Sequence, residues 1–106
     1  MISIPDKARF GGVEYVVELM DEPLQYNGAY LMGACFPHKK LIYVYNNPIS
    51  PSSVEETWLH EALEGILDTY DIDIPHQSIK TIGVALHQFL AESKIDWSKS
   101  AVHPIQ

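Results

Sequence analysis

The spacing of apolar side chains changes near residue 50, and this change constrains the fold more than any other feature of the chain. Before it, residues 13–19 carry apolar side chains at every second position, and Glu14 and Glu18 lie at positions in between. This alternation is typical of a half-buried strand. After it, apolar side chains recur every three to four residues, as on one face of a helix. One such change of period predicts a sheet followed by helices, which is the α+β class.

The first half predicts an N-terminal antiparallel sheet of about three strands, of which residues 13–19 are one. Residues 1–9 are expected to form an extended entry segment. A second apolar run, residues 29–36, holds Gly33, which marks a bulge or a close neighbour. Residues 37–40 then form a hairpin connection to residues 41–45, a run that is apolar on both faces and therefore favours a central position in the sheet.

The first of two expected helices has a start signal before its apolar stripe. Ser52 precedes Glu55 by three residues, the spacing of a capping box, and Ser53 stands in the same relation to Glu56. The helix that starts there is expected to continue to about residue 70. Its apolar stripe is formed by Val54, Trp58, Leu59, Ala62, Leu63, Ile66, Leu67 and Tyr70.

A second helix is expected from about residue 76 to residue 93, after a break at residues 71–75. A chain of 106 residues is most naturally a single domain. We expect the core of that domain to span about residues 5–93. Residues 94–106 are expected to be a tail whose Trp97 can pack back on the core.

Charge and composition exclude several classes of function. The formal net charge is −7, which disfavours binding to nucleic acid or to an anionic membrane, since both are recognised by basic patches. No run of residues is apolar and long enough for a membrane span, and a signal-peptide pattern is missing. The single cysteine, Cys35, cannot form an intrachain disulfide and is expected to be a small buried apolar group. A cytoplasmic protein is the expectation.

The first expected helix also carries a candidate catalytic motif, because residues 60–64 have the pattern H-E-x-x-E. Residues four apart lie on the same face of a helix, so His60 and Glu64 can reach one metal ion. This is the spacing of the H-E-x-x-H helix of zinc peptidases, with Glu64 in place of the second histidine. Glu61 would then be the general base that takes a proton from a zinc-activated water. The bland alternative is an acidic helix with a solvated face.

Catalytic zinc needs a third protein ligand, and two histidines are candidates. If the two helices pack antiparallel, positions equidistant from the loop lie side by side, which brings His87 near His60. His76 is the alternative third ligand. The two lie three turns apart, ~16 Å along the helix, so they cannot both bind one ion. Each also has a structural explanation: His76 as the first residue of a helix, and His87 as a surface residue beside an apolar face.

These motifs follow one another in an order found in a known family. A turn at residues 10–12 leads into an x-Tyr-x-Val strand, followed by a strand with Gly33 and by an aliphatic strand at residues 41–44. The next helix matches Thr-Leu-x-His-Glu-x-x-His/Glu through Thr57, Trp58, Leu59, His60, Glu61 and Glu64. A His-Gln-x-Ile-x-x-Leu-x-x-x-Leu-x-Gln pattern is then matched by His76, Gln77, Ile79, Ile82, Leu86 and Gln88. Over residues 5–93 the chain resembles the short zinc-metallopeptidase-like proteins of phages and prophages, relatives of the ImmA/IrrE-like metallopeptidases.

The resemblance implies a minimal zincin-like domain with Zn²⁺ as cofactor, in the cytoplasm of the host cell if a phage encodes it. It implies peptide-bond hydrolysis, with a protein or peptide as substrate. The chain departs from the family pattern at Glu64 and again at Gly83 and Val84, where many members have an acidic residue. Either a histidine, His87 or His76, replaces that acid as ligand, or the metal site is incomplete.

Two other functions fit the same scaffold. One is a catalytically inactive protein-binding module, such as a phage accessory protein that docks on a host protein. The other is a structural zinc site, whose fourth position is closed by Asp68 or His76. The oligomeric state is left open by the sequence.

Overall fold

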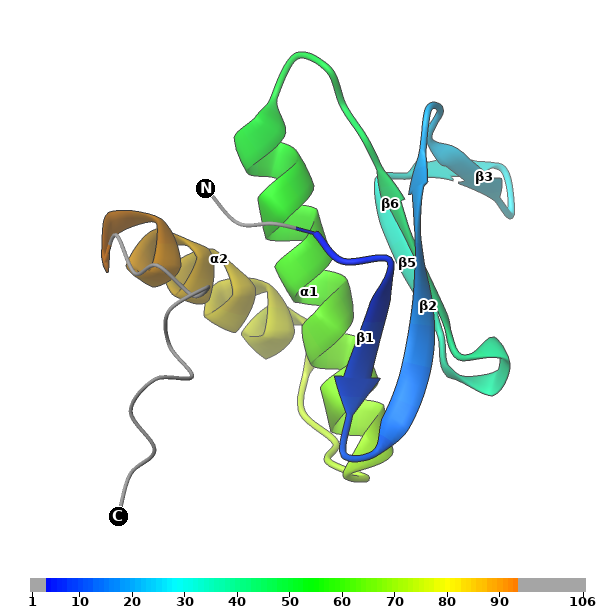
Figure 1. The fold of residues 1–106 in the computed structure, drawn as a ribbon, viewed down its shortest axis with the longest axis vertical. Coiled ribbons are helices and arrows are strands. Elements are labelled where there is room, and N and C mark those ends of the chain that lie inside the picture. The colour runs from blue at the N-terminus through cyan, green and yellow to red at the C-terminus, as the bar shows by residue number, and fades with distance from the viewer. Residues whose placement is uncertain (1–3, 94–106) are drawn as a thin grey trace.

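The computed structural model describes residues 4–93, in which strands precede helices (Figure 1). The expected α+β fold is confirmed. The expected tail at residues 94–106, with Trp97, lies outside the described residues. The elements are β1 (Lys7–Phe10), β2 (Val13–Met20), β3 (Leu24–Tyr26), β4 (Ala29–Leu31), β5 (Gly33–Phe36), the short 3-10 helix η1 (Pro37–Lys39), β6 (Leu41–Tyr45), α1 (Pro51–Thr69) and α2 (His76–Ser93).

The main sheet has four strands in the order β1-β2-β6-β5, and β3 pairs with β4 in a separate hairpin. Strand β6 runs parallel to β2, with Val16 opposite Leu41, whereas the other neighbours are antiparallel. The sheet therefore differs from the expected three antiparallel strands. Residues 29–36 are two strands, not one: β4 belongs to the hairpin, and β5 forms the outer edge of the main sheet beyond β6. The expected entry segment supplies β1 as the other edge.

Strand β6 has the central position expected from its two apolar faces, because it lies between β2 and β5. Its side chains Ile42 and Val44 are fully buried, as is Tyr15 on β2. These side chains point toward α1, which lies between the sheet and α2 (Figure 1). The buried core consists of Phe10, Tyr15, Val17, Ile42, Val44, Val54, Trp58, Leu59 and Ala62.

Cys35 is half-buried and packs against this core, as expected for a small apolar group. Burial raises the pKa of its thiol to about 12, so the thiol is protonated and a poor nucleophile at neutral pH.

Helix α1 begins one residue before the earlier of the two capping boxes. Pro51 is its first residue, a position where the fixed φ of proline suits a helix and its missing N–H costs nothing. The N-cap, Ser50, makes no side-chain hydrogen bond. Glu55 does not reach back to cap the helix, because its side chain is buried against α2.

The end of α1 determines where α2 begins. Asp71 adopts a left-handed φ of 55°, and the backbone N–H of Ile72 donates to the carbonyl of Leu67 at 2.8 Å. The N–H of Asp71 donates to the carbonyl of Asp68 at 3.1 Å, which completes a Schellman motif. The chain consequently turns back along the last turns of α1, so that α2 begins beside Glu64. Neither helix in residues 4–93 combines the length and apolarity that crossing a membrane requires.

Candidate metal centre

Three side chains from the two helices converge at the start of α2. His60 Nε2 lies 3.9 Å from Glu64 Oε1, one turn along α1. His76 Nδ1, on the first residue of α2, lies 3.4 Å from the same Glu64 oxygen. The His60 and His76 rings meet edge to face with centroids 5.0 Å apart. One ligand atom from each residue lies within 4.8 Å of the others, which makes this a three-residue donor set.

The donor set fits tetrahedral zinc. Zinc–ligand distances of ~2.0–2.1 Å in a tetrahedron place neighbouring ligand atoms about 3.3 Å apart, close to the 3.4 and 3.9 Å observed. Burial lowers the pKa of His60, and the neutral imidazole that this favours is the form that binds a metal. The nearby Glu64 carboxylate opposes that shift, whereas the charges of His76 and Lys80 add to it. His76 is 65% exposed, so its ring can rotate toward an ion from the solvent side.

Glu61 lies beside this donor set in an unfavourable environment for a carboxyl group. Only 6% of the residue is exposed, and within residues 4–93 its Oε1 has no hydrogen-bond partner. Burial, and then the neighbouring Glu64 carboxylate, raise the pKa of Glu61 to about 8. A buried polar atom without a partner is rare and costly, and such atoms concentrate at functional sites. The Glu61 carboxyl therefore suits a cation or a water beside it.

His87, the third ligand expected from helix packing, is not part of the cluster. Its Nε2–H donates to Glu55 Oε1 at 2.9 Å, and both side chains are 10% exposed. Gly83 lies where His87 was expected: a Cβ on Gly83 would be 3.7 Å from the Cα of His60. The pairing of the helices is shifted by one turn because the loop folds back along the end of α1, which places His76 beside Glu64.

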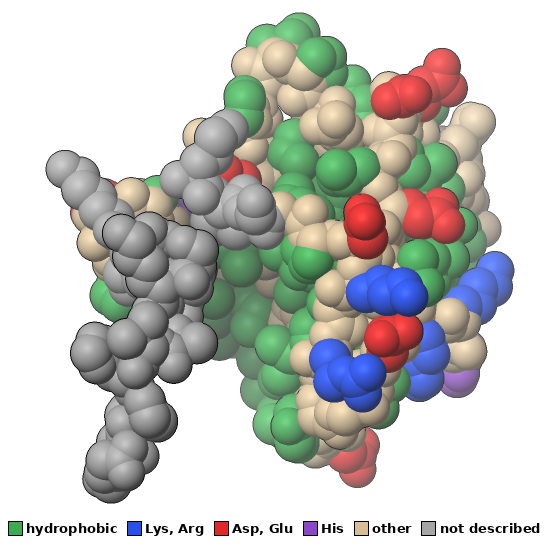
Figure 2. Space-filling view, viewed as in Figure 1, with side chains coloured by type: hydrophobic (Ala, Val, Ile, Leu, Met, Phe, Trp, Pro, Cys, Tyr) green, Lys and Arg blue, Asp and Glu red, His purple; other side chains and the backbone are tan. Residues whose placement is uncertain are grey.

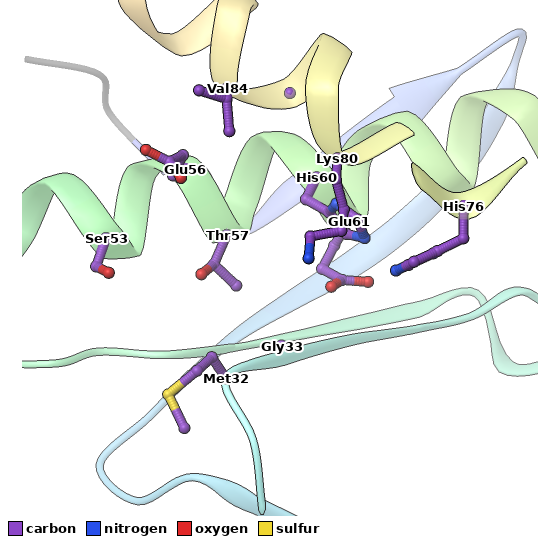
Figure 3. Close-up of a pocket in the computed structure, with 11 residues that line it drawn as sticks. Met32, Gly33, Ser53, Glu56, Thr57, His60, Glu61, His76, Lys80 and Val84 are labelled. Atoms are coloured by element: carbon purple, nitrogen blue, oxygen red, sulfur yellow. The ribbon is translucent and has the colours of Figure 1, made fainter. Parts of the chain in front are cut away.

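Gly33 brings the sheet close to the site. A Cβ on Gly33 would meet Thr57 Cγ2 at 2.5 Å and Glu61 Cγ at 3.1 Å, so β5 and α1 approach here more closely than any side chain on residue 33 allows. Of the two expected roles for this glycine, the structure shows the close neighbour. The Glu61 side chain is thus held between α1 and the start of β5 (Figure 3).

The cluster opens into a cleft of about 300 Å³ between the two helices and the start of β5 (Figure 3). His60, Glu61 and His76 lie on one part of its wall. The full lining is Met32, Gly33, Ser53, Glu56, Thr57, His60, Glu61, His76, Lys80, Gly83 and Val84. A cleft of this size can take a short stretch of substrate next to the donor set.

Two residues of this cleft, Lys80 and Glu56, were not among the site residues predicted from the sequence. Lys80 follows His76 by four residues, so it lies one turn along on the same face of α2, and that spacing is a signal that could have identified it. Glu56 lies one turn before His60 and lines the other end of the cleft. By contrast Asp68, a candidate for a closing fourth ligand, is absent from the cluster found among residues 4–93.

Comparison of the chain with protein-family models, with curated proteins and with solved structures finds no match. The function is therefore argued from the geometry of this cleft.

Proposed function

We propose that the protein is a small zinc-dependent hydrolase of the metallopeptidase type, with His60, Glu64 and His76 as its metal ligands. The observation that carries the proposal is the pairing of this donor set with Glu61, a buried carboxyl group of which one oxygen, Oε1, has no hydrogen-bond partner among residues 4–93. A structural metal site activates no water and therefore needs no carboxyl group beside its ligands. A hydrolytic site needs one next to its water.

Three ligands leave the fourth tetrahedral position open, as in catalytic zinc sites. Zinc bound there would polarise a water and a substrate carbonyl. Glu61 takes a proton from the water as its oxygen adds to the carbonyl carbon. Glu61 then delivers that proton to the amine nitrogen as the C–N bond breaks, which leaves an amine and a carboxylic acid, and the acid then loses its proton to solvent. Glu61 must be charged to accept a proton, and the positive charge of a bound metal favours that form over the protonated one.

The experiment that tests this proposal separates metal binding from turnover. Wild type and Glu61→Gln, purified without chelators, are assayed for zinc content and for hydrolysis of a peptide library by mass spectrometry. Because Glu61 is not a ligand, we expect both proteins to carry zinc and only the wild type to cleave peptides. Equal cleavage by the two proteins would overturn the role of Glu61. Zinc in the wild type without cleavage of any peptide would favour the binding module described next.

The alternative of an inactive binding module has support on the other side of the sheet. Val16 points away from α1 and is 43% exposed, between the buried Tyr15 and Val17. Figure 2 views the sheet along its edge and shows Lys and Arg side chains interspersed among Asp and Glu there, with hydrophobic side chains between them. A mixed surface of this kind can hold a protein partner. If this face is the functional one, a protein captured by the wild type from host lysate is lost with Val16→Glu and kept with His60→Ala.

A further inference from the structure

Lys80 is an exposed residue that gives the wall of the cleft a positive charge. It is the only lysine or arginine among the described residues that line the cleft. It lies on α2, one turn after His76, and Figure 3 shows its side chain extending from the helix into the cleft. No carboxylate of residues 4–93 lies within 4 Å of its ammonium group.

The acidic groups around the cleft have other partners. The two negative charges of Glu61 and Glu64 would be balanced by a divalent metal at the donor set. Glu56, the remaining carboxylate of the lining, lies 3.8 Å from His87 Nδ1. With these groups assigned, the ammonium of Lys80 is left to interact with a ligand.

We propose that Lys80 is an anion-binding residue beside the metal centre, where it holds the oxygen that becomes negative during hydrolysis. This inference rests on the proposed function. When the water oxygen adds to the carbonyl carbon, one electron pair of the C=O bond moves onto the carbonyl oxygen. That oxygen is negative until the C–N bond breaks, and a preorganised cationic donor stabilises it more than it stabilises the neutral carbonyl.

Lysine suits this role because its four-carbon stem can reach across the cleft and its ammonium group carries three donors. The other hydrogen-bonding side chains along the wall are less suited. His60 and His76 serve as ligands, and the Ser53 and Thr57 hydroxyls are neutral. Substrates or inhibitors with a negatively charged tetrahedral group should therefore bind better than neutral analogues of the same shape.

Inorganic phosphate is the probe that tests this, because it is tetrahedral, anionic and independent of the unknown substrate. The full chain is loaded with Co²⁺, whose visible absorption reports anions that bind at the metal, and is titrated with phosphate. Wild type is compared with Lys80→Met, with Lys80→Arg and with Lys39→Met, a control that removes the same charge from η1, away from the cleft. We expect at least about tenfold weaker phosphate binding in Lys80→Met only. Lys80→Arg, which keeps the charge, and the control should stay within about threefold of wild type.

The outcomes separate this proposal from the one on which it rests. A Co²⁺ spectrum in the wild type, with equal phosphate affinity in wild type and Lys80→Met, overturns the role of Lys80 alone. Equal weakening in Lys39→Met also overturns it, because the effect is then one of net charge. A wild type that binds no Co²⁺ overturns the metal centre, and with it the role of Lys80. Melting temperatures are expected to be the same in all four proteins, and Co²⁺ affinity should not fall in Lys80→Met, because that change removes a positive charge beside the donor set.

Discussion

Glu61 is a carboxyl group kept from water by α1 on one side and by the start of β5 on the other. Its pKa is raised from 4.5 to about 8, mainly by burial, so in the metal-free protein it holds its proton at neutral pH. The unfolded chain releases that proton at the ordinary pKa. Between these two values the folded state binds more protons than the unfolded state, and the free energy of unfolding falls as the pH rises.

Chelator-treated wild type should therefore be less stable at pH 8 than at pH 5.5, and Glu61→Gln should remove much of the difference. At pH 8 we expect the variant to be more stable than wild type, on the order of 2 kcal/mol, since an amide neither takes up a proton nor buries a charge when the chain folds. Urea unfolding of both proteins in EDTA at the two pH values measures this. If the two proteins lose the same stability between pH 5.5 and pH 8, Glu61 has an ordinary pKa in the folded protein.

Strand β5 and helix α1 pack closely against each other at Gly33. Gly33→Ala pushes its methyl group into Thr57 and Glu61, so it should lower the free energy of unfolding by about 1–3 kcal/mol. Gly83→Ala is the matched control, because its methyl group would make an ordinary contact at 3.7 Å inside α2. That change should stabilise the protein by up to about 1 kcal/mol. Two equally destabilised variants, compared by thermal or urea unfolding, would contradict the close approach.

His87 and His76 lie on the same helix, and we expect their side chains to contribute differently to the stability of the metal-free protein. His87→Ala removes a buried hydrogen bond to the Glu55 carboxylate and leaves a cavity, so it should cost about 2–4 kcal/mol of stability in the absence of metal. His76→Ala removes an exposed side chain and should cost less than about 0.5 kcal/mol under the same conditions. Urea unfolding in EDTA distinguishes them, and a larger loss with His76→Ala would reverse the two roles.

The sequence predicted the helices well and the sheet less well, for physical reasons. The 3.6-residue period and the break before His76 are local signals, and both helices lie where they were expected. The division of residues 29–36 into β4 and β5 depends on which strands pair, which local alternation does not encode. The fold-back after α1 depends on Asp71 in a left-handed conformation, where glycine is the commoner residue.

The candidate site was likewise predictable in part. His60, Glu61 and Glu64 are set by spacing within a single helix, so the sequence identified them together. The third residue of the donor set depends on the register between the two helices, and a shift of one turn places His76 there in place of His87. The exposure and pairing of Lys80 depend on the same packing. Features within one element were therefore predictable, and features between elements were not.

The proposed metal centre would connect the two helices of the molecule, because His60 and Glu64 lie on α1 and His76 on α2. An ion bound by all three stabilises the folded state by mass action, by about 2.7 kcal/mol at a concentration one hundredfold above its dissociation constant. The link between metal binding and helix packing is the central claim about this protein.

Zinc content, determined by elemental analysis after purification without chelators, tests that claim most directly. Wild type and His87→Ala should each carry about one zinc per chain, because His87 is bonded to Glu55 and not to the metal. His60→Ala and His76→Ala should carry little or none. A wild type without zinc, or zinc that is lost with His87→Ala and kept with His76→Ala, would contradict the metal centre proposed here.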